Sequence, residues 1–293
     1  MSTWTFEAIG TRWQIDTARP LEPRVRADVE AAVETFDRTW SRFRGDSVVT
    51  AAAGASGAWD VGMHGLGLLD HYDELHAATD GAVSPLVGQT LVDLGYDADY
   101  SLVPTGASTP VGDWAALRRE GAVVVGRDGV LRTDRPLLLD VGAAGKGLLV
   151  ALVAAVVSRE VNQLTVDASG DLYHHGTAPI RVALEHPGDA TRAVGVLDVE
   201  PEQSLCASAV NRRTWGDGLH HVVDARTGRP TTDVVAAWVL VDQSCLWADG
   251  LATAHFFAPD PQVLLDLRPH HFVRIHADGR VLRSPDLPGE LFT

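Results

Sequence analysis

An aspartate and a threonine in the C-terminal part of the chain have a spacing suited to metal binding. Asp249 and Thr253 stand four residues apart in the segment ADGLATAHFF, which has helical character. Positions i and i+4 lie on one face of a helix, so a carboxylate and a hydroxyl oxygen would project side by side. Hard oxygen ligands of this kind suit Mg²⁺ or Ca²⁺. Capping of a helix end is the alternative interpretation of Asp249.

A glycine-rich segment in the middle of the chain is suited to binding a phosphate. The apolar run over 137–140 predicts a buried strand, and a loop with Gly142, Gly145 and Gly147 then leads into an apolar helix over 146–160. Glycines let backbone N–H groups approach a ligand closely, and a helix N-terminus offers unpaired donors. The segment is not a P-loop, because that motif needs Ser or Thr where Gly147 stands. Tight packing of the turn alone is the alternative.

A third segment, LHHVVDARTGRP at 219–230, carries two adjacent histidines. Successive side chains of a strand point to opposite faces, so His220 and His221 cannot both face one site. A zinc site is disfavoured because no HxxxH or HExxH spacing accompanies the pair. We expect one of the two at most to serve a site, and an ordinary structural role is the alternative for either.

The elements that would position these segments predict an α+β fold with largely antiparallel sheets. Apolar residues recur every three to four positions over 23–40 and 66–79, which predicts two amphipathic helices, the second ended by Gly81. Asp-Gly turns predict hairpins around 128–129 and 278–279. Hairpins with helices inserted in blocks are typical of the α+β class. Further strands are expected at 164–167, 180–184, 194–199, 220–224 and 234–241, a helix at 247–257, and an exposed excursion after Tyr96 to about Gly112.

Composition excludes several classes of function. The chain has 293 residues with 24 Lys plus Arg and 39 Asp plus Glu, a formal charge of −15. This balance argues against nucleic-acid binding and against a polybasic membrane anchor. The longest apolar run, Leu148 to Val157, has ten residues, whereas a bilayer span needs roughly 20. The N-terminus lacks the pattern of a secretory signal, so we expect no membrane insertion and a cytoplasmic location.

The order of the segments resembles that of one protein family along nearly the whole chain. The matching pieces are AIGTRWQI, WSRFRGDSVVT, DGAVSPLVGQTLVDLGYD, LDVGAAGKG, VDASGDLY, RVALEHP, HHVVDARTGRP and ADGLATAHFF. In this order they resemble the ApbE family, the FAD:protein FMN transferases. The resemblance implies an ApbE-like, T-fold-like architecture, with residues 1–293 as a single domain or as two closely packed α+β subdomains.

The resemblance also implies how the three segments join in one site. Asp249 and Thr253 match the side chains that bind Mg²⁺ in the family, and Gly145 matches the residue whose carbonyl completes the protein ligands. His221 matches the histidine beside the flavin phosphates, where an imidazole titrating near neutrality would act as general base or proton relay. Contacts to the FAD molecule are implied for Ala82, Val83 and Ser84 on the adenosine side and for Gly142 and Leu148 on the flavin nucleotide.

Lys146, the only lysine of the chain, lies between two of the loop glycines. A compact ammonium fits where a guanidinium would not, so we expect Lys146 to contact FAD. The implied reaction is Mg²⁺-dependent transfer of FMN from FAD to a Thr or Ser hydroxyl of a partner protein, with release of AMP. The partner should be cytosolic or face the cytosol.

Three places in the sequence depart from the family pattern, and two alternative functions stay open. Ser208-Ala-Val-Asn211 replaces a serine-glycine followed by an acidic and an aromatic residue, although Arg213 keeps the basic position. Ala225 replaces a common proline, and Ser84 a frequent acidic residue. Attack by water in the same site would give an FAD pyrophosphatase that releases FMN and AMP. Loss of catalysis would leave a flavin-binding protein.

Overall fold

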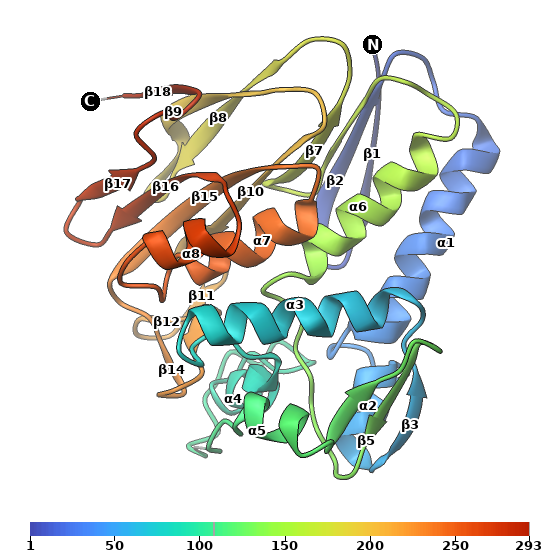
Figure 1. Cartoon of the computed structure of the whole chain (residues 1–293), viewed down its shortest axis with the longest axis vertical. Coiled ribbons are helices and arrows are strands. Elements are labelled where there is room, and N and C mark those ends of the chain that lie inside the picture. Colours follow the sequence, from blue (N-terminus) through green and yellow to red (C-terminus); the bar gives the residue numbers. More distant parts are fainter. Residues whose placement is uncertain (108, 293) are drawn as a thin grey trace.

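An eight-stranded sheet runs through the protein, and every neighbouring pair of its strands is antiparallel (Figure 1). The computed structural model describes residues 1–107 and 109–292. In spatial order the strands are β1 (Ser2–Ala8), β2 (Thr11–Thr17), β6 (Leu164–Asp167), β7 (Asp171–His175), β10 (Gln203–Ala209), β15 (Val234–Asp242), β16 (His271–His276) and β17 (Val281–Arg283).

Helices cover one face of this sheet. α6 (Gly145–Val157) and α7 (Cys245–Ala254) pack on the strands, α1 (Pro23–Trp40) packs beside α6, and α3 (His64–Ala78) contacts α7 (Figure 1). No helix formed by the described residues is long and apolar enough to cross a membrane. The shorter helices are α2 (Val48–Gly54), α4 (Gly88–Asp93), α5 (Trp114–Arg119), α8 (Gln262–Leu267) and the 3₁₀ turns η1 (Pro85–Val87) and η2 (Val210–Arg212).

A smaller sheet packs against the opposite face. It has the order β18 (Gly289–Leu291), β9 (Asp189–Val199) and β8 (Ile180–His186). Side chains of β10 and β15 alternate between the two layers, as the period of a strand requires. Leu205 and Trp238 join the apolar cluster under the small sheet, whereas Cys206 and Val239 join the larger cluster under the helices.

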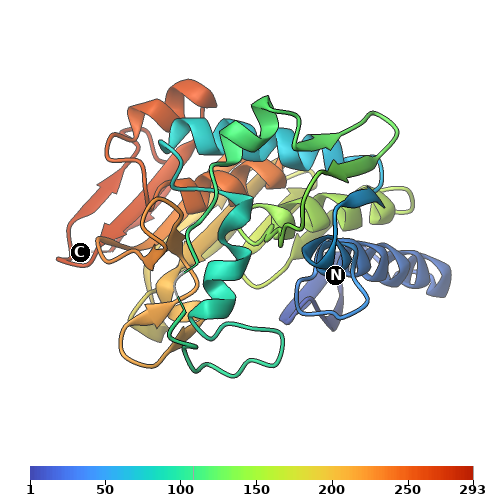
Figure 2. The same cartoon turned by 90° about the horizontal axis from the view of Figure 1, so that it is seen from below.

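A third group of short elements lies below α3 in Figure 1. Seen from below, the N-terminus lies near α1 and the C-terminus on the other side of the molecule (Figure 2). The short strands are β3 (Gly57–Asp60), β5 (Val130–Thr133) and β4 (Val123–Val125) in one sheet, with the pairs β11 (Thr214–Trp215) and β12 (Leu219–His220), and β13 (Val223–Asp224) and β14 (Arg229–Pro230).

Most of the elements expected from the sequence are confirmed. The α+β class, the helices beginning at Pro23 and ending before Gly81, and both Asp-Gly hairpins are present. Gly81 has φ +90° and donates its N–H to His76 O, so it ends α3 as predicted. The excursion after Tyr96 forms no helix or strand up to α5 in the residues described, and Ser108 lies outside them.

Three details of the prediction are wrong. Residues 137–140 are not a strand, because Leu137 and Asp140 donate to Ala52 O and Pro85 O in loops and helices rather than to a neighbouring strand. The expected strand at 220–224 bends at His221 and splits into β12 and β13, which have different partners. The helix predicted at 247–257 begins at Cys245, so Asp249 lies in its second turn instead of at its start.

Close contact between helices depends on two glycines. A Cβ atom on Gly147 of α6 would lie 2.2 Å from the carbonyl oxygen of Cys245 and 2.7 Å from Cβ of Asp249, both in α7. A Cβ atom on Gly250 of α7 would lie 2.2 Å from Nε2 of His71 in α3. Contacts this short do not occur between real atoms, so only glycine lets the three helices approach one another this closely.

Gly147→Ala should therefore destabilise the protein by about 1–3 kcal/mol, the usual cost of overpacking a tight contact. Gly67→Ala is the matched control, because Gly67 is exposed in α3 and its Cβ would meet nothing within 4 Å. The control should stabilise by about 0.5–1 kcal/mol through helix propensity. Urea unfolding of both variants measures the difference. Equal effects of the two substitutions would contradict the close contact.

Candidate active site

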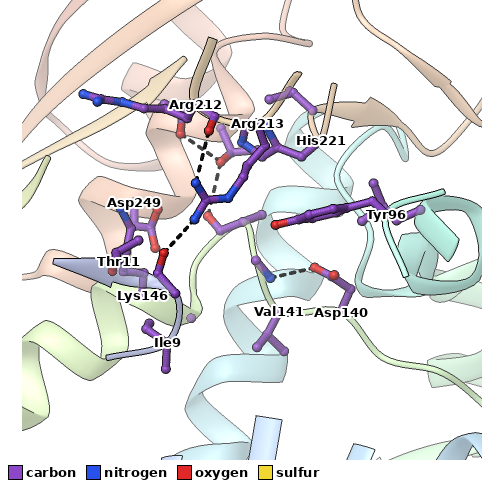
Figure 3. A pocket seen from close by; sticks show the side chains of 18 of the residues that line it. Ile9, Thr11, Tyr96, Asp140, Val141, Lys146, Arg212, Arg213, His221 and Asp249 are labelled. Atoms are coloured by element: carbon purple, nitrogen blue, oxygen red, sulfur yellow. Dashed lines mark hydrogen bonds between the residues drawn. The ribbon is translucent and has the colours of Figure 1, made fainter. Parts of the chain in front are cut away.

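A cleft of about 900 Å³ lies at the start of α6, beside α7 (Figure 3). It is large enough for a nucleotide. Nine of the ten sequence-predicted residues line it: Ala82, Val83, Ser84, Gly142, Gly145, Lys146, His221, Asp249 and Thr253. Leu148 does not line the cleft and instead belongs to the large apolar cluster, with 8% of its surface exposed. The fold thus brings together three segments that are far apart in the chain.

Asp249 and Thr253 face the cleft from α7 and also bind the glycine loop. Oδ2 of Asp249 accepts a hydrogen bond of 2.7 Å from the N–H of Gly147, in the first turn of α6. Oγ1 of Thr253 lies 3.3 Å from the carbonyl oxygen of Ala143 and 3.3 Å from Oγ of Ser208. Asp249 therefore caps a helix, as the alternative interpretation held, but the helix is α6 and not its own.

A second buried carboxylate lies behind Asp249. Asp171, at the start of β7, is fully buried, and its Oδ2 lies 3.1 Å from Nζ of Lys146. Burial, with the charge of Asp171 in addition, raises the pKa of Asp249 well above the usual carboxyl range. Burial also raises the pKa of Asp171, against the opposing charge of Lys146. Sequence reasoning missed Asp171, although it lies in the quoted piece VDASGDLY.

His221 and His220 point in opposite directions, as the strand argument predicted. His221 lines the cleft near Arg213 and Tyr96 (Figure 3). His220 turns away, and its Nε2 lies 2.8 Å from the carbonyl oxygen of Thr231. Burial lowers the pKa of His221 to about 4. The expectation that His221 titrates near neutrality is therefore wrong for the protein without ligand, because burial disfavours the charged imidazolium and the nearby Arg213 guanidinium repels it.

Arg42 and Asp140 support the glycine loop and were not found from the sequence. Arg42 is buried, and its Nε donates to Oδ2 of Asp140 at 2.5 Å. Oδ1 of Asp140 in turn accepts the N–H of Gly142 at 2.8 Å (Figure 3). The guanidinium also stacks over the rings of Phe43 and Tyr96. The only signal in the sequence was the piece WSRFRGDS, which carries Arg42 without indicating its partner.

Arg213 lies across the cleft and ties two of its walls together (Figure 3). Its Nη2 donates to the carbonyl oxygen of Gly10, in the β1–β2 turn, at 2.7 Å. Arg12, in β2, also lines the cleft. Neither arginine forms an ion pair within the described part of the chain, so both charges are available to an anionic ligand.

No cluster of three or more His, Cys, Asp or Glu side chains suited to a metal occurs within residues 1–107 and 109–292. The predicted ligand set has one carboxylate, one hydroxyl and one carbonyl, so it does not depend on such a cluster. The carbonyl oxygen that lies beside Thr253 is that of Ala143. The role of Gly145 as a metal ligand remains a prediction.

The fold and the cleft define an α+β protein with a nucleotide-sized site at a helix start. The chain belongs to the ApbE family, whose sequence profile matches residues 9–271. The FAD:protein FMN transferase of Rhodobacter capsulatus is 26% identical over 98% of this chain and 58% of its own length. The FAD:protein FMN transferase of Klebsiella pneumoniae is 26% identical over 84% of this chain and 75% of its own length.

The solved structures give the same fold. The crystal structure of the ApbE protein from Thermotoga maritima matches with a TM-score of 0.78 at 19% identity, over 97% of both chains. The flavin transferase ApbE from Vibrio cholerae matches with a TM-score of 0.75 at 22% identity, also over 97% of both chains. At these identities the likeness establishes the architecture.

The lowered pKa of His221 can be tested by its titration. We expect a midpoint near pH 4 in the folded protein and near the ordinary value of about 6.5 in concentrated urea. Between these values the unfolded chain binds more protons, so His221 lowers stability as the pH falls from about 6.5 to about 4. Imidazole ¹⁵N NMR, assigned with His221→Gln, measures both midpoints. A folded-state midpoint between pH 6 and 7 would refute the lowered pKa.

Proposed function

We propose that the protein transfers FMN from FAD to a Thr or Ser hydroxyl of a target protein and releases AMP. Membership of the ApbE family, together with an acid and a hydroxyl beside the glycine loop, carries this proposal. The relatives that match in sequence are named for this activity. A cytosolic location of the target remains a prediction from the sequence.

Mg²⁺ is the proposed cofactor, and the residues present fit it. Asp249 and Thr253 offer hard oxygens to the cleft, with the Gly145 carbonyl as the predicted third ligand. Two carboxylates, Asp171 and Asp249, are buried beside a single ammonium, that of Lys146, which pairs with Asp171, so Asp249 has no ion-pair partner of its own among the described residues. Bound there, Mg²⁺ would neutralise the FAD pyrophosphate during the displacement.

The FAD molecule would be held by groups on several sides of the cleft. Ala82, Val83 and Ser84 are proposed for the adenosine part, and Gly142 for the flavin nucleotide. The expected contact of Lys146 with FAD stays a prediction, since its Nζ is bound by Asp171 and the carbonyl oxygen of Ala168. The uncompensated guanidinium groups of Arg12 and Arg213 suit the pyrophosphate, since charge-assisted hydrogen bonds to phosphate are strong. The whole chain carries a charge of −15 and so repels an anionic ligand. Attraction of the pyrophosphate would therefore depend on these local cations.

His221 is the proposed proton acceptor. It is neutral at pH 7 and lines the cleft, so it can take the proton as the target hydroxyl oxygen bonds to the FMN phosphorus. The bond from that phosphorus to the bridging oxygen breaks, AMP leaves with this oxygen, and the imidazolium releases its proton to solvent. A bound pyrophosphate would raise the pKa of His221 from its low value and make it a better base.

Incubation with FAD and Mg²⁺, with and without candidate target proteins, tests the reaction. We expect AMP and flavin-labelled target in equal amounts, measured by chromatography and by in-gel flavin fluorescence. AMP without labelled target would identify an FAD pyrophosphatase instead. Bound FAD with no AMP in either condition would identify a flavin-binding protein without catalysis.

Asp249→Ala should lower the Mg²⁺-dependent rate of AMP release by roughly 100-fold or more, because it removes the charged ligand. The matched control is Asp266→Ala, which removes an exposed carboxylate from α8. Because Asp249 also caps α6, circular dichroism is needed to show that both variants fold. An unchanged Mg²⁺ requirement in Asp249→Ala would refute the metal assignment.

A further inference from the structure

The Lys146 ammonium is bound by groups other than Asp249. Its Nζ lies 3.1 Å from Oδ2 of Asp171 and donates to the carbonyl oxygen of Ala168 at 3.2 Å. No oxygen of Asp249 lies within 4.0 Å of Nζ of Lys146, which is the limit for an ion pair. The two side chains are still close enough for the charge of Lys146 to oppose the rise in the pKa of Asp249. The single ammonium therefore pairs with the rear carboxylate.

Both partners of Lys146 come from one rigid turn between β6 and β7. Ser169 and Gly170 have positive φ angles, of +58° and +108°. The N–H of Gly170 donates to Oδ1 of Asp167, and Oγ of Ser169 donates to the carbonyl oxygen of Arg12. These two hydrogen bonds hold the turn in place. The Ala168 carbonyl and the Asp171 carboxylate would therefore stay where they are if Lys146 moved toward the cleft.

Asp171 itself is out of reach of a ligand. Its surface is 0% exposed, and it does not line the cleft. The fully buried thiols of Cys206 and Cys245 lie close to it. Asp249, in contrast, does line the cleft. The two carboxylates therefore differ in role: one can touch a cation, and the other can only act through Lys146.

We propose that Asp171 is a positioning residue of the cation site, which binds the Lys146 ammonium and so leaves the Asp249 carboxylate free for a divalent cation. The inference rests on the proposed function in that it takes Asp249 as the ligand. Without the negative charge of Asp171, Lys146 would turn to Asp249, and its positive charge would compete with the cation for the same oxygens.

Binding of Mn²⁺ to the full chain without FAD, followed by the EPR signal of free Mn²⁺, tests this. Asp171→Asn should weaken binding by about tenfold or more, because the ammonium becomes the partner of Asp249. Lys146→Met should strengthen binding, because the competing charge is gone. The double variant should bind within about threefold of the original protein, since it removes one charge of each sign.

The double variant separates charge balance from simple damage to the fold. If Asp171 were only structural, the double variant would bind as weakly as Asp171→Asn or more weakly, and that result would overturn the proposal. Unchanged binding in Asp171→Asn, weaker binding in Lys146→Met, or no Mn²⁺ binding by the original protein would do the same. Should Asp171→Asn fail to fold, Lys146→Met and the double variant, which replaces a buried ion pair by neutral groups, still decide the question.

AMP release and target labelling measured on the same variants keep the two proposals apart. FMN transfer by the original protein, together with unchanged Mn²⁺ binding in Asp171→Asn, would overturn the role of Asp171 and leave the function intact. The expected Mn²⁺ pattern without any AMP release would support the role of Asp171 and refute the transfer reaction.

Discussion

The close approach of α6 and α7 is the constraint on which the rest of the site depends. Gly147 has no side chain, so its N–H reaches Oδ2 of Asp249 at 2.7 Å, and the backbone of Cys245 passes directly over it. This contact places a carboxylate, a hydroxyl and the glycine loop on one wall of the cleft. The eight-stranded sheet beneath supplies a rigid base, because both helices pack on strands that are paired on each side.

A buried excess of negative charge follows from the same contact. Asp249 caps a neighbouring helix from the protein interior, so its carboxylate loses its hydration. The buried carboxylate of Asp171 is close enough to raise the pKa of Asp249 further. One ammonium cannot neutralise both carboxylates, and burial of an uncompensated charge is costly. A divalent cation could relieve that cost only where Asp249 meets the cleft. The proposed cation site would in this way be a consequence of how the helices pack.

The sequence predicted those parts of the structure that follow from local spacing. The opposite directions of His220 and His221 follow from strand geometry, and the shared face of Asp249 and Thr253 follows from helix geometry. The pairing of Lys146 with Asp171 and of Arg42 with Asp140 joins residues 25 and 98 positions apart, and no local pattern encodes such pairs. Likewise, an apolar run at 137–140 shows burial but cannot show whether a neighbouring strand exists to pair with it.

The departure from the family pattern at 208–211 falls at the end of β10 and in the turn η2, at the rim of the cleft. Ser208, at the start of the segment, keeps its place beside Thr253, and Arg213, beyond its end, reaches Gly10. The altered residues between them form the end of β10 and the turn η2, where Asn211 is exposed and lines the cleft. The contact of Ser208 with Thr253, a proposed metal ligand, is therefore present. The altered residues lie at the exposed rim of the cleft, past which a target hydroxyl would have to come in the proposed reaction.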